Sequence, residues 1–412
     1  MKQPNRRLFF AGLILIVLVV LLLDPADITN RVFSRRRPPV PPQMVSAGVS
    51  LVQDRGADPI TFVLDALDDH RAVFLGEFPQ IAEHPRFLAE LVPLLPEHGV
   101  RAVGVDFALA RDQVLIDRLT TGPEYDEDLA HRILRRRLPI WGYREYAEVF
   151  RAAWELNRGR PETDRIRIIG LNVMDDQRPT QLPREERPTG AELGRALFPN
   201  GLPDRGMART ALEALETIDG PVLLYAGARH AFTRFRDLEY ENRMAELGFP
   251  DARRAGNILQ AELGEDIVTV YLHGPWPDEQ GRNGLTFAAG GLIDAIVEEA
   301  ADASEEAAEE GPRFAIPISG SPLAEHYIEH GDYAKLRDGF SFGDLTDAYV
   351  VLAPTGELSA ATPIEDFITE ANIESARAGF PGHLPQNAEP RDINAYIARV
   401  SANLDDILEG FD

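Results

Sequence analysis

Six short apolar runs of the kind that forms buried β-strands recur along this chain of 412 residues, and longer segments of helical pattern separate them. The predicted strands span residues 72–75, 101–107, 166–171, 221–226, 267–272 and 347–352. Connections of helix length between consecutive strands favour parallel pairing, right-handed crossovers and helices on both faces of one sheet. The sequence therefore predicts a three-layer α/β/α fold with a mostly parallel sheet.

Most of the chain between these runs has helical spacing of apolar residues, as in residues 144–157, but two stretches depart from it. Residues 175–206 are rich in Pro, Arg and Gly and predict a long loop excursion, which in a compact domain is usually functional or disordered. Residues 298–312 are rich in Glu, Asp and Ala. They predict an acidic insertion, either an exposed helix end or a flexible linker.

The N-terminal 45 residues predict a membrane anchor followed by a stiff spacer. Lys2, Arg6 and Arg7 precede an unbroken apolar run over residues 8–23, a pattern typical of a secretory signal or a signal anchor. No small-x-small cleavage site follows this run, which favours a retained single-pass transmembrane helix. The Pro-rich stretch behind it would act as a spacer, so that residues 46–412 form one domain, predicted to lie outside the cytoplasm.

The charge of the chain limits its partners. The formal net charge is −25, and because the first 45 residues carry an excess of basic side chains, the remainder is more acidic still. A body of this charge repels nucleic acid and anionic lipid surfaces, so no nucleic-acid partner is expected. The absence of cysteine excludes disulfides, thiolate zinc sites and cysteine nucleophiles.

Polar residues follow or interrupt the predicted strands close to their carboxyl ends. Glu77 stands in a predicted tight turn with Gly76, directly after the first strand. In α/β sheets the carboxyl ends of the strands form the crevice in which ligands bind. The same position is predicted for Asp106, Asn172, His230 and His273, and His84 follows one helical turn into the first helix after Glu77. Two carboxylates and two imidazoles there are suited to acid–base catalysis or to binding a hard metal ion.

Each of these residues also has a structural interpretation. Glu77 could cap the helix that follows it, because an acidic side chain near a helix N-terminus is favourable. A lone histidine such as His230 is about as often a hydrogen-bonded structural residue as a catalytic one, and His273 could brace the turn that follows it. Trp141 and Tyr143, between two predicted helices, are core or lid residues in the simplest interpretation and ligand-binding residues in the other.

Common motifs of high specificity are missing from the sequence. It contains no His-Glu-x-x-His zinc motif, no EF-hand loop, no Gly-x-Ser-x-Gly elbow and no phosphate-binding glycine loop. The sequence therefore gives no metal-ligand set, and it disfavours serine hydrolases of the common type and P-loop enzymes.

The stretch from Leu75 to His84, Leu-Gly-Glu-Phe-Pro-Gln-Ile-Ala-Glu-His, resembles the opening motif of the erythromycin-esterase-like and ChaN-like superfamily. In the haem-uptake branch that motif reads roughly Leu-Gly-Glu-x-His-Asp-Asn-x-x-His. The run from Gly227 to His230 resembles the second motif, Gly-x-x-His. The resemblance extends over residues 69–363 and includes Asp106, Trp141, Tyr146 and Asn172.

The superfamily contains esterases that open macrolide rings, metal-dependent peptidases of the Tiki type and haem-binding lipoproteins. The resemblance implies that Glu77, Asp106 and His230 activate water, and we expect Arg229 to steady a developing oxyanion. His84, Asn172, His273, Trp141 and Tyr143 are the expected ligand-binding residues. One departure bears on activity: Pro79 stands where the opening motif has its first histidine.

Two hypotheses follow. The first is a membrane-anchored extracytoplasmic hydrolase that acts on or binds a small ester, amide or peptide, held to the membrane through residues 8–23. The second, favoured by Pro79, is a catalytically degenerate binding or scaffold protein of the same fold, for haem or for an envelope partner. Haem and a divalent metal ion are the candidate cofactors, and the sequence assigns neither.

Overall fold

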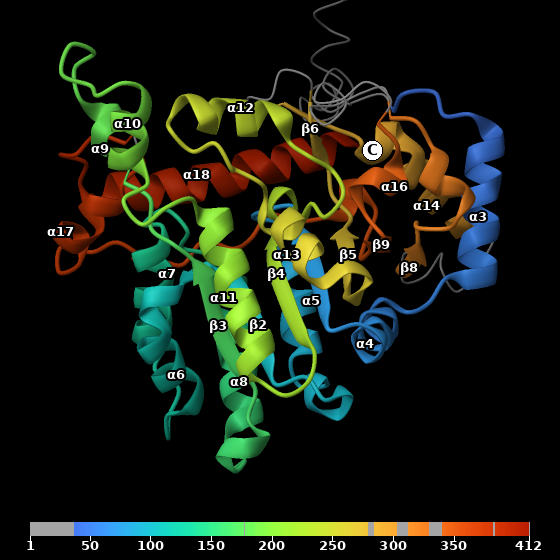
Figure 1. Ribbon diagram of the computed structural model, residues 1–412, viewed down its shortest axis with the longest axis horizontal. Helices are drawn as coiled ribbons and strands as arrows, with labels where there is room; N and C mark the ends of the chain where they lie inside the picture. The colour runs from blue at the N-terminus through green and yellow to red at the C-terminus, as the bar shows by residue number, and fades with distance from the viewer. Residues whose placement is uncertain are drawn as a thin grey trace, which may run out of the picture.

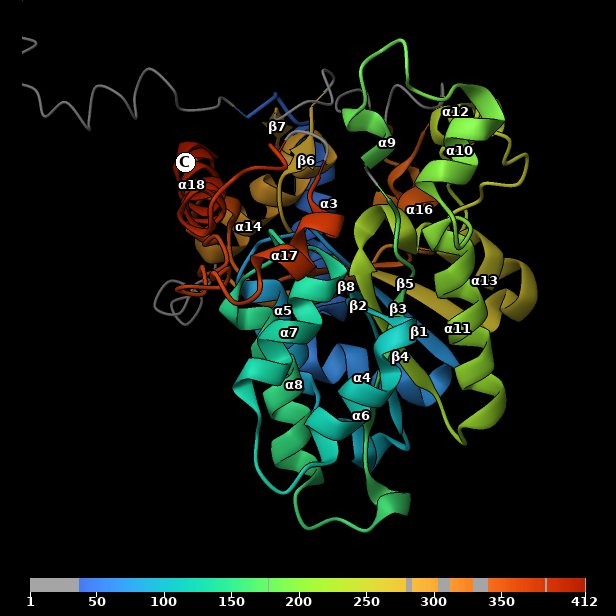
Figure 2. The same cartoon turned by 90° about the vertical axis from the view of Figure 1, so that its left-hand side faces the viewer.

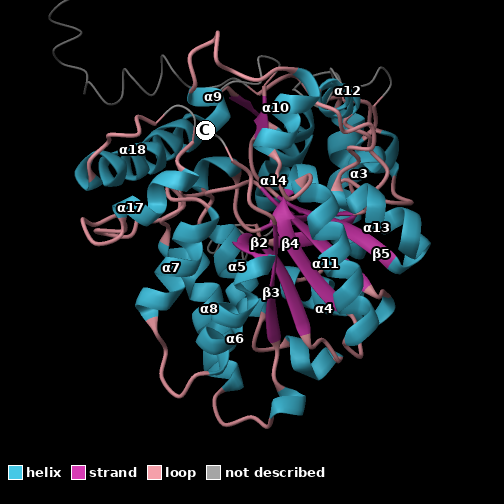
Figure 3. Ribbon diagram, turned by 60° about the vertical axis from the view of Figure 1, so that its left-hand side comes forward, coloured by secondary structure: helices cyan, strands magenta, loops and turns pink. Residues whose placement is uncertain are grey.

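A seven-stranded sheet forms the centre of the computed structural model, with the strand order β3-β2-β4-β1-β5-β9-β8 (Figures 1 and 3). All neighbouring pairs are parallel except β8 and β9. The structure describes residues 37–176, 178–278, 284–302, 312–328, 340–381 and 384–411. The strands of this sheet are β1 (Ala72–Glu77), β2 (Ala102–Leu109), β3 (Arg167–Asn172), β4 (Val222–Gly227), β5 (Ile267–Leu272), β8 (Phe314–Pro317) and β9 (Ala348–Val351), and β6 (Trp276–Pro277) pairs with β7 (Leu285–Thr286) outside it.

Both faces of the sheet are buried, which is why its strands are apolar at nearly every position. In β1, Val73 and Leu75 belong to one core cluster, and Ala72 and Phe74 belong to a second. Successive side chains of a strand point to opposite faces, so each face needs its own layer of helices. The predicted three-layer architecture with a mostly parallel sheet is therefore confirmed.

Helices α4 to α8 pack against one face, and α3, α11, α13 and α14 against the other (Figure 2). Long α18 crosses the end of the sheet toward which the parallel strands point, and α9, α10 and α12 lie at that end too (Figure 1). The helices are α3 (Pro42–Arg55), α4 (Pro59–Asp69), α5 (Glu83–Leu91), α6 (Gln113–Thr121), α7 (Glu127–Arg137), α8 (Arg144–Asn157), α9 (Arg178–Gln181), α10 (Gly190–Leu197), α11 (Pro203–Thr217), α12 (Leu238–Glu246), α13 (Ala255–Leu263), α14 (Leu292–Asp302), α16 (Phe342–Leu345), α17 (Ile373–Ala376) and α18 (Pro390–Leu408).

The turn after β1 lies later in the chain than predicted. Gly76 and Glu77 are the last residues of the strand, and Gly76 is paired with both neighbouring strands. The chain turns after them, where Gln80 has a φ of +72°, a left-handed conformation that is uncommon for a residue other than glycine. Glu77 is therefore held by the sheet itself and is more rigid than a residue in a turn would be.

The segment 175–206 is more ordered than the predicted loop. It contains α9 and α10, and α11 begins at Pro203. Gly194 of α10 lies against the backbone of Leu247, since a Cβ added at Gly194 would be 1.9 Å from the Leu247 carbonyl oxygen. The segment 175–206 and the region of α12 thus pack together, and α9, α10 and α12 lie beyond the carboxyl edge of the sheet.

A C-terminal segment, residues 358–364, ties together the two loops beside that edge. Ala361 N donates to the Gln80 carbonyl oxygen at 2.7 Å, and Arg144 N donates to the Thr362 carbonyl oxygen at 2.9 Å. Ser401 of α18 donates to the Ala361 carbonyl oxygen at 2.9 Å and so fixes the segment from above. The order of the site thus depends on residues at the far end of the chain.

The predicted anchor, residues 8–23, lies outside the described residues. In the part of the chain that the structure describes, no helix is long and apolar enough to cross a membrane. Helix α3 begins at Pro42, inside the predicted spacer, and packs against α14. The predicted acidic insertion begins within α14, which ends at Asp302.

Asn157, buried at the end of α8, offers a test of the packing between helices and sheet. Its side chain accepts from Ile166 N at 2.9 Å and donates to the carbonyl oxygens of Ile166 and Thr120 at 2.9 and 3.1 Å. We expect Asn157→Leu to lower the free energy of unfolding by about 3 kcal/mol, because it leaves three buried backbone groups without partners.

The measurement is urea denaturation, with Asn200→Leu as the control. The exposed Asn200 makes one long bond, 3.3 Å to the Met174 carbonyl oxygen, and its replacement should change stability by less than about 0.5 kcal/mol. Equal effects of the two substitutions would contradict this packing.

Candidate functional site

Three neighbouring strands, β2, β4 and β1, meet at a small cavity at their carboxyl ends. The cavity has a volume of about 160 Å³. Of the predicted site residues, the structure brings Glu77, Asp106, His230 and Trp141 to its wall. The full lining is Glu77, Pro79, Asp106, Phe107, Arg137, Leu138, Trp141, Gly227 and His230.

Glu77, the last residue of β1, is buried and accepts two hydrogen bonds on one carboxyl oxygen. The hydroxyl of Tyr146 donates to Oε2 at 3.0 Å, and the hydroxyl of Tyr225 donates to the same atom. The pKa of Glu77 is raised from 4.5 to about 8, first by burial and then by the charge of Asp106, while the hydrogen bonds from the two hydroxyls lower it. At neutral pH Glu77 is therefore a carboxylic acid, able to donate a proton into the cavity.

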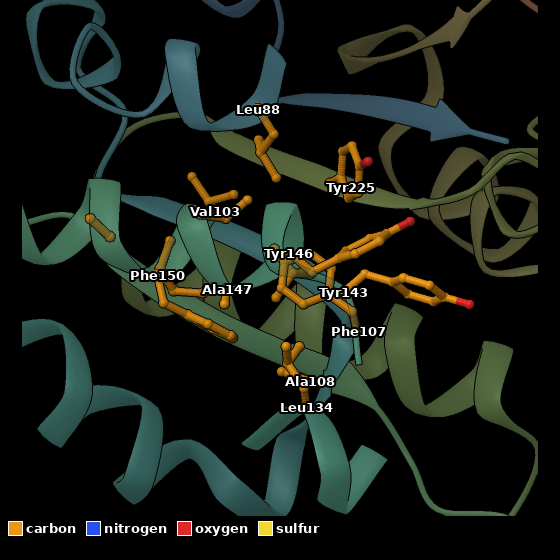
Figure 4. Close-up of a cluster of buried hydrophobic side chains, with 14 of the residues drawn as sticks. Leu88, Val103, Phe107, Ala108, Leu134, Tyr143, Tyr146, Ala147, Phe150 and Tyr225 are labelled. Carbon is orange, nitrogen blue, oxygen red and sulfur yellow. The ribbon is translucent and has the colours of Figure 1, made fainter. Parts of the chain in front are cut away.

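The two tyrosines come from different layers of the fold. Tyr146 is on α8 and Tyr225 is on β4, and the ring of Phe107 lies edge-on to both, with centroids 5.2 and 6.1 Å away. Figure 4 shows that the hydroxyls of Tyr143, Tyr146 and Tyr225 lie on one side of an otherwise apolar cluster. Burial, followed by the charge of Glu77, raises the pKa of Tyr146 and of Tyr225 well above 10, so both hydroxyls remain donors.

Asp106 lies inside β2, where the strand departs from regular pairing with β3. Its carboxylate accepts from Gly227 N at 3.1 Å, at the end of β4. Its carbonyl oxygen accepts from Asn172 Nδ2 at 3.0 Å and from Arg137 Nε at 3.3 Å. Asn172 is thus a support for the backbone of Asp106, and it does not line the cavity.

His230 lies in a short 3-10 helix after β4 and has a carboxylate partner that the sequence analysis missed. Its Nδ1 is 2.8 Å from Oδ1 of Asp204, the second residue of α11. Asp204 is buried, and although burial raises its pKa, the charge of His230, the bond to it and the charge of Arg254 together hold the pKa below its ordinary value. An ionised Asp204 accepts a hydrogen bond from Nδ1–H of His230, which leaves Nε2 as the nitrogen able to take up a proton.

The arginine of the cavity is Arg137, at the end of α7, and Arg229 is not part of the wall. Arg229 Nη1 is 3.7 Å from Oδ2 of Asp237, which holds it behind the site. Arg137 has no carboxylate within 4.0 Å among the residues that the structure describes. The role expected for Arg229, steadying an oxyanion, is therefore better suited to Arg137.

His84 and His273 lie next to one another but away from the cavity. Burial lowers the pKa of His84 to about 4, and its Nε2 is 2.9 Å from the His273 carbonyl oxygen. His273 is buried with Nδ1 3.2 Å from the Tyr349 hydroxyl and Nε2 2.9 Å from Oγ1 of Thr355. Both rings have partners for both nitrogens, so they brace the loops after β1 and β5, and their expected role in ligand binding is not supported.

Trp141, Tyr143 and Pro79 complete the wall and its support. The Tyr143 hydroxyl accepts from Gln80 Nε2 at 3.1 Å, and Gln80 N donates to the Tyr146 hydroxyl at 3.0 Å. These bonds hold the left-handed turn beside Glu77. The Trp141 ring packs on Tyr146, 5.5 Å between centroids, and the Pro79 ring occupies the wall at the place where the resembling motif has a histidine.

The residues present do not fit a divalent metal ion or a haem. Within the described ranges, no three His, Asp or Glu side chains are grouped so that they could hold a metal ion. Glu77 is protonated at neutral pH, and Pro79 has no ligand atom. For haem, His230 is the one cavity histidine in the described part of the chain, and 160 Å³ is below the 300–1,000 Å³ of ordinary small-molecule sites.

No protein-family model matches the sequence, and no curated protein is similar to it in sequence. Solved structures do match. A succinoglycan biosynthesis protein is 13% identical with a TM-score of 0.52, and the match covers 78% of this chain and 98% of that one. A protein from Bacillus cereus is 12% identical with a TM-score of 0.50, covering 79% of this chain and 100% of the other.

An erythromycin esterase mutant in its open conformation also matches, with 13% identity, a TM-score of 0.46 and coverage of 77% of this chain and 98% of that one. At these identities a match concerns the fold and not the activity. The two matches with TM-scores of 0.50 and 0.52 show that this chain shares its fold with those proteins.

Proposed function

We propose that this chain is a hydrolase-like enzyme that uses acid–base chemistry on a small ester, amide or peptide bond at the carboxyl edge of its sheet. The observation that carries the proposal is the pairing in one cavity of a neutral acid, Glu77, with the carboxylate-bound imidazole of His230. When the surroundings of two titratable groups keep one protonated and the other unprotonated at the same pH, the pair is typical of a general acid and a general base.

The steps follow from these positions. Water loses a proton to His230 Nε2 as its oxygen bonds to the substrate carbonyl carbon, and Asp204 stabilises the imidazolium that forms. Arg137 faces the oxygen that becomes negative. The carbon–leaving-group bond then breaks as Glu77 gives its proton to the leaving group. The proton on His230 returns to Glu77 through solvent, which restores the starting state.

Asp106 has a different role from Glu77. Its carboxylate is held by Gly227 N, so it can orient the attacking water without donating a proton. Burial is the larger cause of the raised pKa of Glu77, and the charge of Asp106 raises that pKa further.

The size of the cavity limits what enters it. A volume of 160 Å³ holds a reacting group and a few waters, but not a whole molecule of drug size. The rest of the substrate would lie along the rim, near α9, α10 and α12. Anchoring through residues 8–23, with the acidic body outside the cytoplasm, belongs to this proposal and is supported by the sequence pattern alone.

The alternative is a binding protein on an inactive form of the fold, and Pro79 is the observation that favours it. We expect titration with haem to leave the haem absorbance spectrum unchanged, because a cavity of 160 Å³ is too small to hold a haem. A shifted Soret band that His230→Ala removes would support the binding protein and contradict the hydrolase.

The role of His230 is tested by His230→Gln on a panel of p-nitrophenyl esters and short peptides. Glutamine cannot take up the proton, so we expect kcat/KM to fall by 10²- to 10⁴-fold, within the range of general-base contributions. His98→Gln is the matched control, because His98 pairs with Asp68 on the surface. Equal turnover of the two variants would refute the assignment.

The protonation of Glu77 is tested by the pH dependence of stability. Its pKa is raised from 4.5 to about 8 in the folded state, so the folded state binds the proton more tightly. The tighter binding of this proton adds to the free energy of unfolding; the addition is fully present below pH 4.5 and is lost as the pH rises to 8. We expect Glu77→Gln to become more stable than the unmodified chain by a few kcal/mol between pH 5 and pH 8.

Urea denaturation at pH 5, 6.5 and 8 measures this difference, and Glu97→Gln, at an exposed position, is the control. A stability difference for Glu77→Gln that does not change with pH would show that Glu77 is ionised in the folded protein.

A further inference from the structure

A line of buried charged groups continues behind His230, beyond the proposed catalytic residues. Arg254, 7% exposed, lies between two carboxylates. Its Nη1 is 3.4 Å from Oδ2 of Asp204 and its Nη2 donates to Oδ2 of Asp237 at 2.6 Å. The line thus runs from His230 through Asp204 and Arg254 to Asp237, with Arg229 at the far end.

The guanidinium of Arg254 is fixed in place. Its carbon lies 3.6 Å from the centroid of the Tyr240 ring, so the ring covers one face of the group. Its backbone N donates to Asn257 Oδ1 at 3.1 Å, at the start of α13. The side chain therefore cannot turn away from Asp204 without losing its contact with Tyr240 of α12 and its bond to Asp237.

The charges of the line balance only when Arg254 is included. Two buried carboxylates, Asp204 and Asp237, face two guanidinium groups, Arg254 and Arg229. Without Arg254 one buried carboxylate would lack a cation, and buried carboxylates without a cation take up protons. A proton on Asp204 would remove the acceptor that holds the Nδ1 proton of His230.

We propose that Arg254 is a positioning residue, which keeps Asp204 ionised so that Nδ1–H of His230 stays hydrogen-bonded to Asp204 and Nε2 faces the cavity as the base. The part of this inference that concerns catalysis rests on the proposed hydrolase function, but the effect of Arg254 on the ionisation of Asp204 does not. The other charged or titratable groups around His230 are Glu77 and Asp106 from the strands, Arg137 from α7 and Tyr240 from α12.

Two substitutions in the full chain should act in opposite directions. Arg254→Met removes a positive charge, so protons bind more readily nearby, and the acid limb of the kcat/KM profile for p-nitrophenyl esters should move about one pH unit upward. Asp237→Asn removes a negative charge and keeps the cap on Tyr240 N, so the acid limb should move downward. Arg254→Lys, which keeps the charge, should leave the limb in place.

The control is Arg253→Met, since Arg253 pairs with Asp251 at the surface and should not alter the profile. Unchanged limbs in both Arg254→Met and Asp237→Asn would overturn the proposal, as would shifts in the same direction. If Arg254→Met does not fold, the direction of the Asp237→Asn shift decides alone.

A second measurement does not depend on turnover. The hydrogen-bonded Nδ1 proton of His230 should give a low-field proton NMR signal that His230→Gln lacks. As the pH falls, we expect the signal to disappear at a higher pH in Arg254→Met than in the unmodified chain. Identical behaviour in the two proteins would overturn the inference even if no ester is hydrolysed, whereas a shifted signal without hydrolysis would refute only the proposed function.

Discussion

The site depends on one costly arrangement, a carboxyl group buried at the end of the central strand beside a second carboxylate. Burial and the charge of Asp106 both oppose ionisation of Glu77, and two tyrosine hydroxyls that cannot themselves ionise at neutral pH hold its oxygen. The lowest-energy state at neutral pH is therefore a neutral acid with a fixed orientation. The two hydroxyls belong to Tyr225 of β4 and Tyr146 of α8, so both the sheet and this helix must be folded before Glu77 is held as a neutral acid.

The surroundings of the other buried carboxyl group near the cavity, Asp204, have the opposite effect on its protonation. Glu77 is neutral because it is buried beside Asp106, whereas Asp204 is ionised because His230 and Arg254 flank it. Similar side chains thus take opposite protonation states within one edge of the sheet. The C-terminal segment that binds the loops at Gln80 and Arg144 adds rigidity to this edge, which matters because catalytic geometry tolerates little displacement.

The apolar strands and their parallel arrangement could be predicted from the sequence, because a strand buried on both faces must be apolar throughout. The meeting of Glu77 and Asp106 followed from that topology. Asp204 could not be predicted, since it begins a helix 26 positions before His230 and meets it only through the packing of α11. Arg229 was expected in the site because it precedes His230 in the sequence, but that closeness does not say where a side chain points after a strand ends. Within residues 175–206, α9 and α10 are only 4 and 8 residues long, too short to be distinguished from a loop in a stretch rich in Pro and Gly.

The proton that Glu77 carries at neutral pH can be observed in an infrared difference spectrum between the unmodified chain and Glu77→Gln, recorded at pH 7 and again above pH 9. We expect the C=O stretch of a protonated carboxyl group at pH 7, replaced by carboxylate bands at the higher pH, consistent with a pKa of about 8. A spectrum with carboxylate bands alone at pH 7 would contradict this expectation.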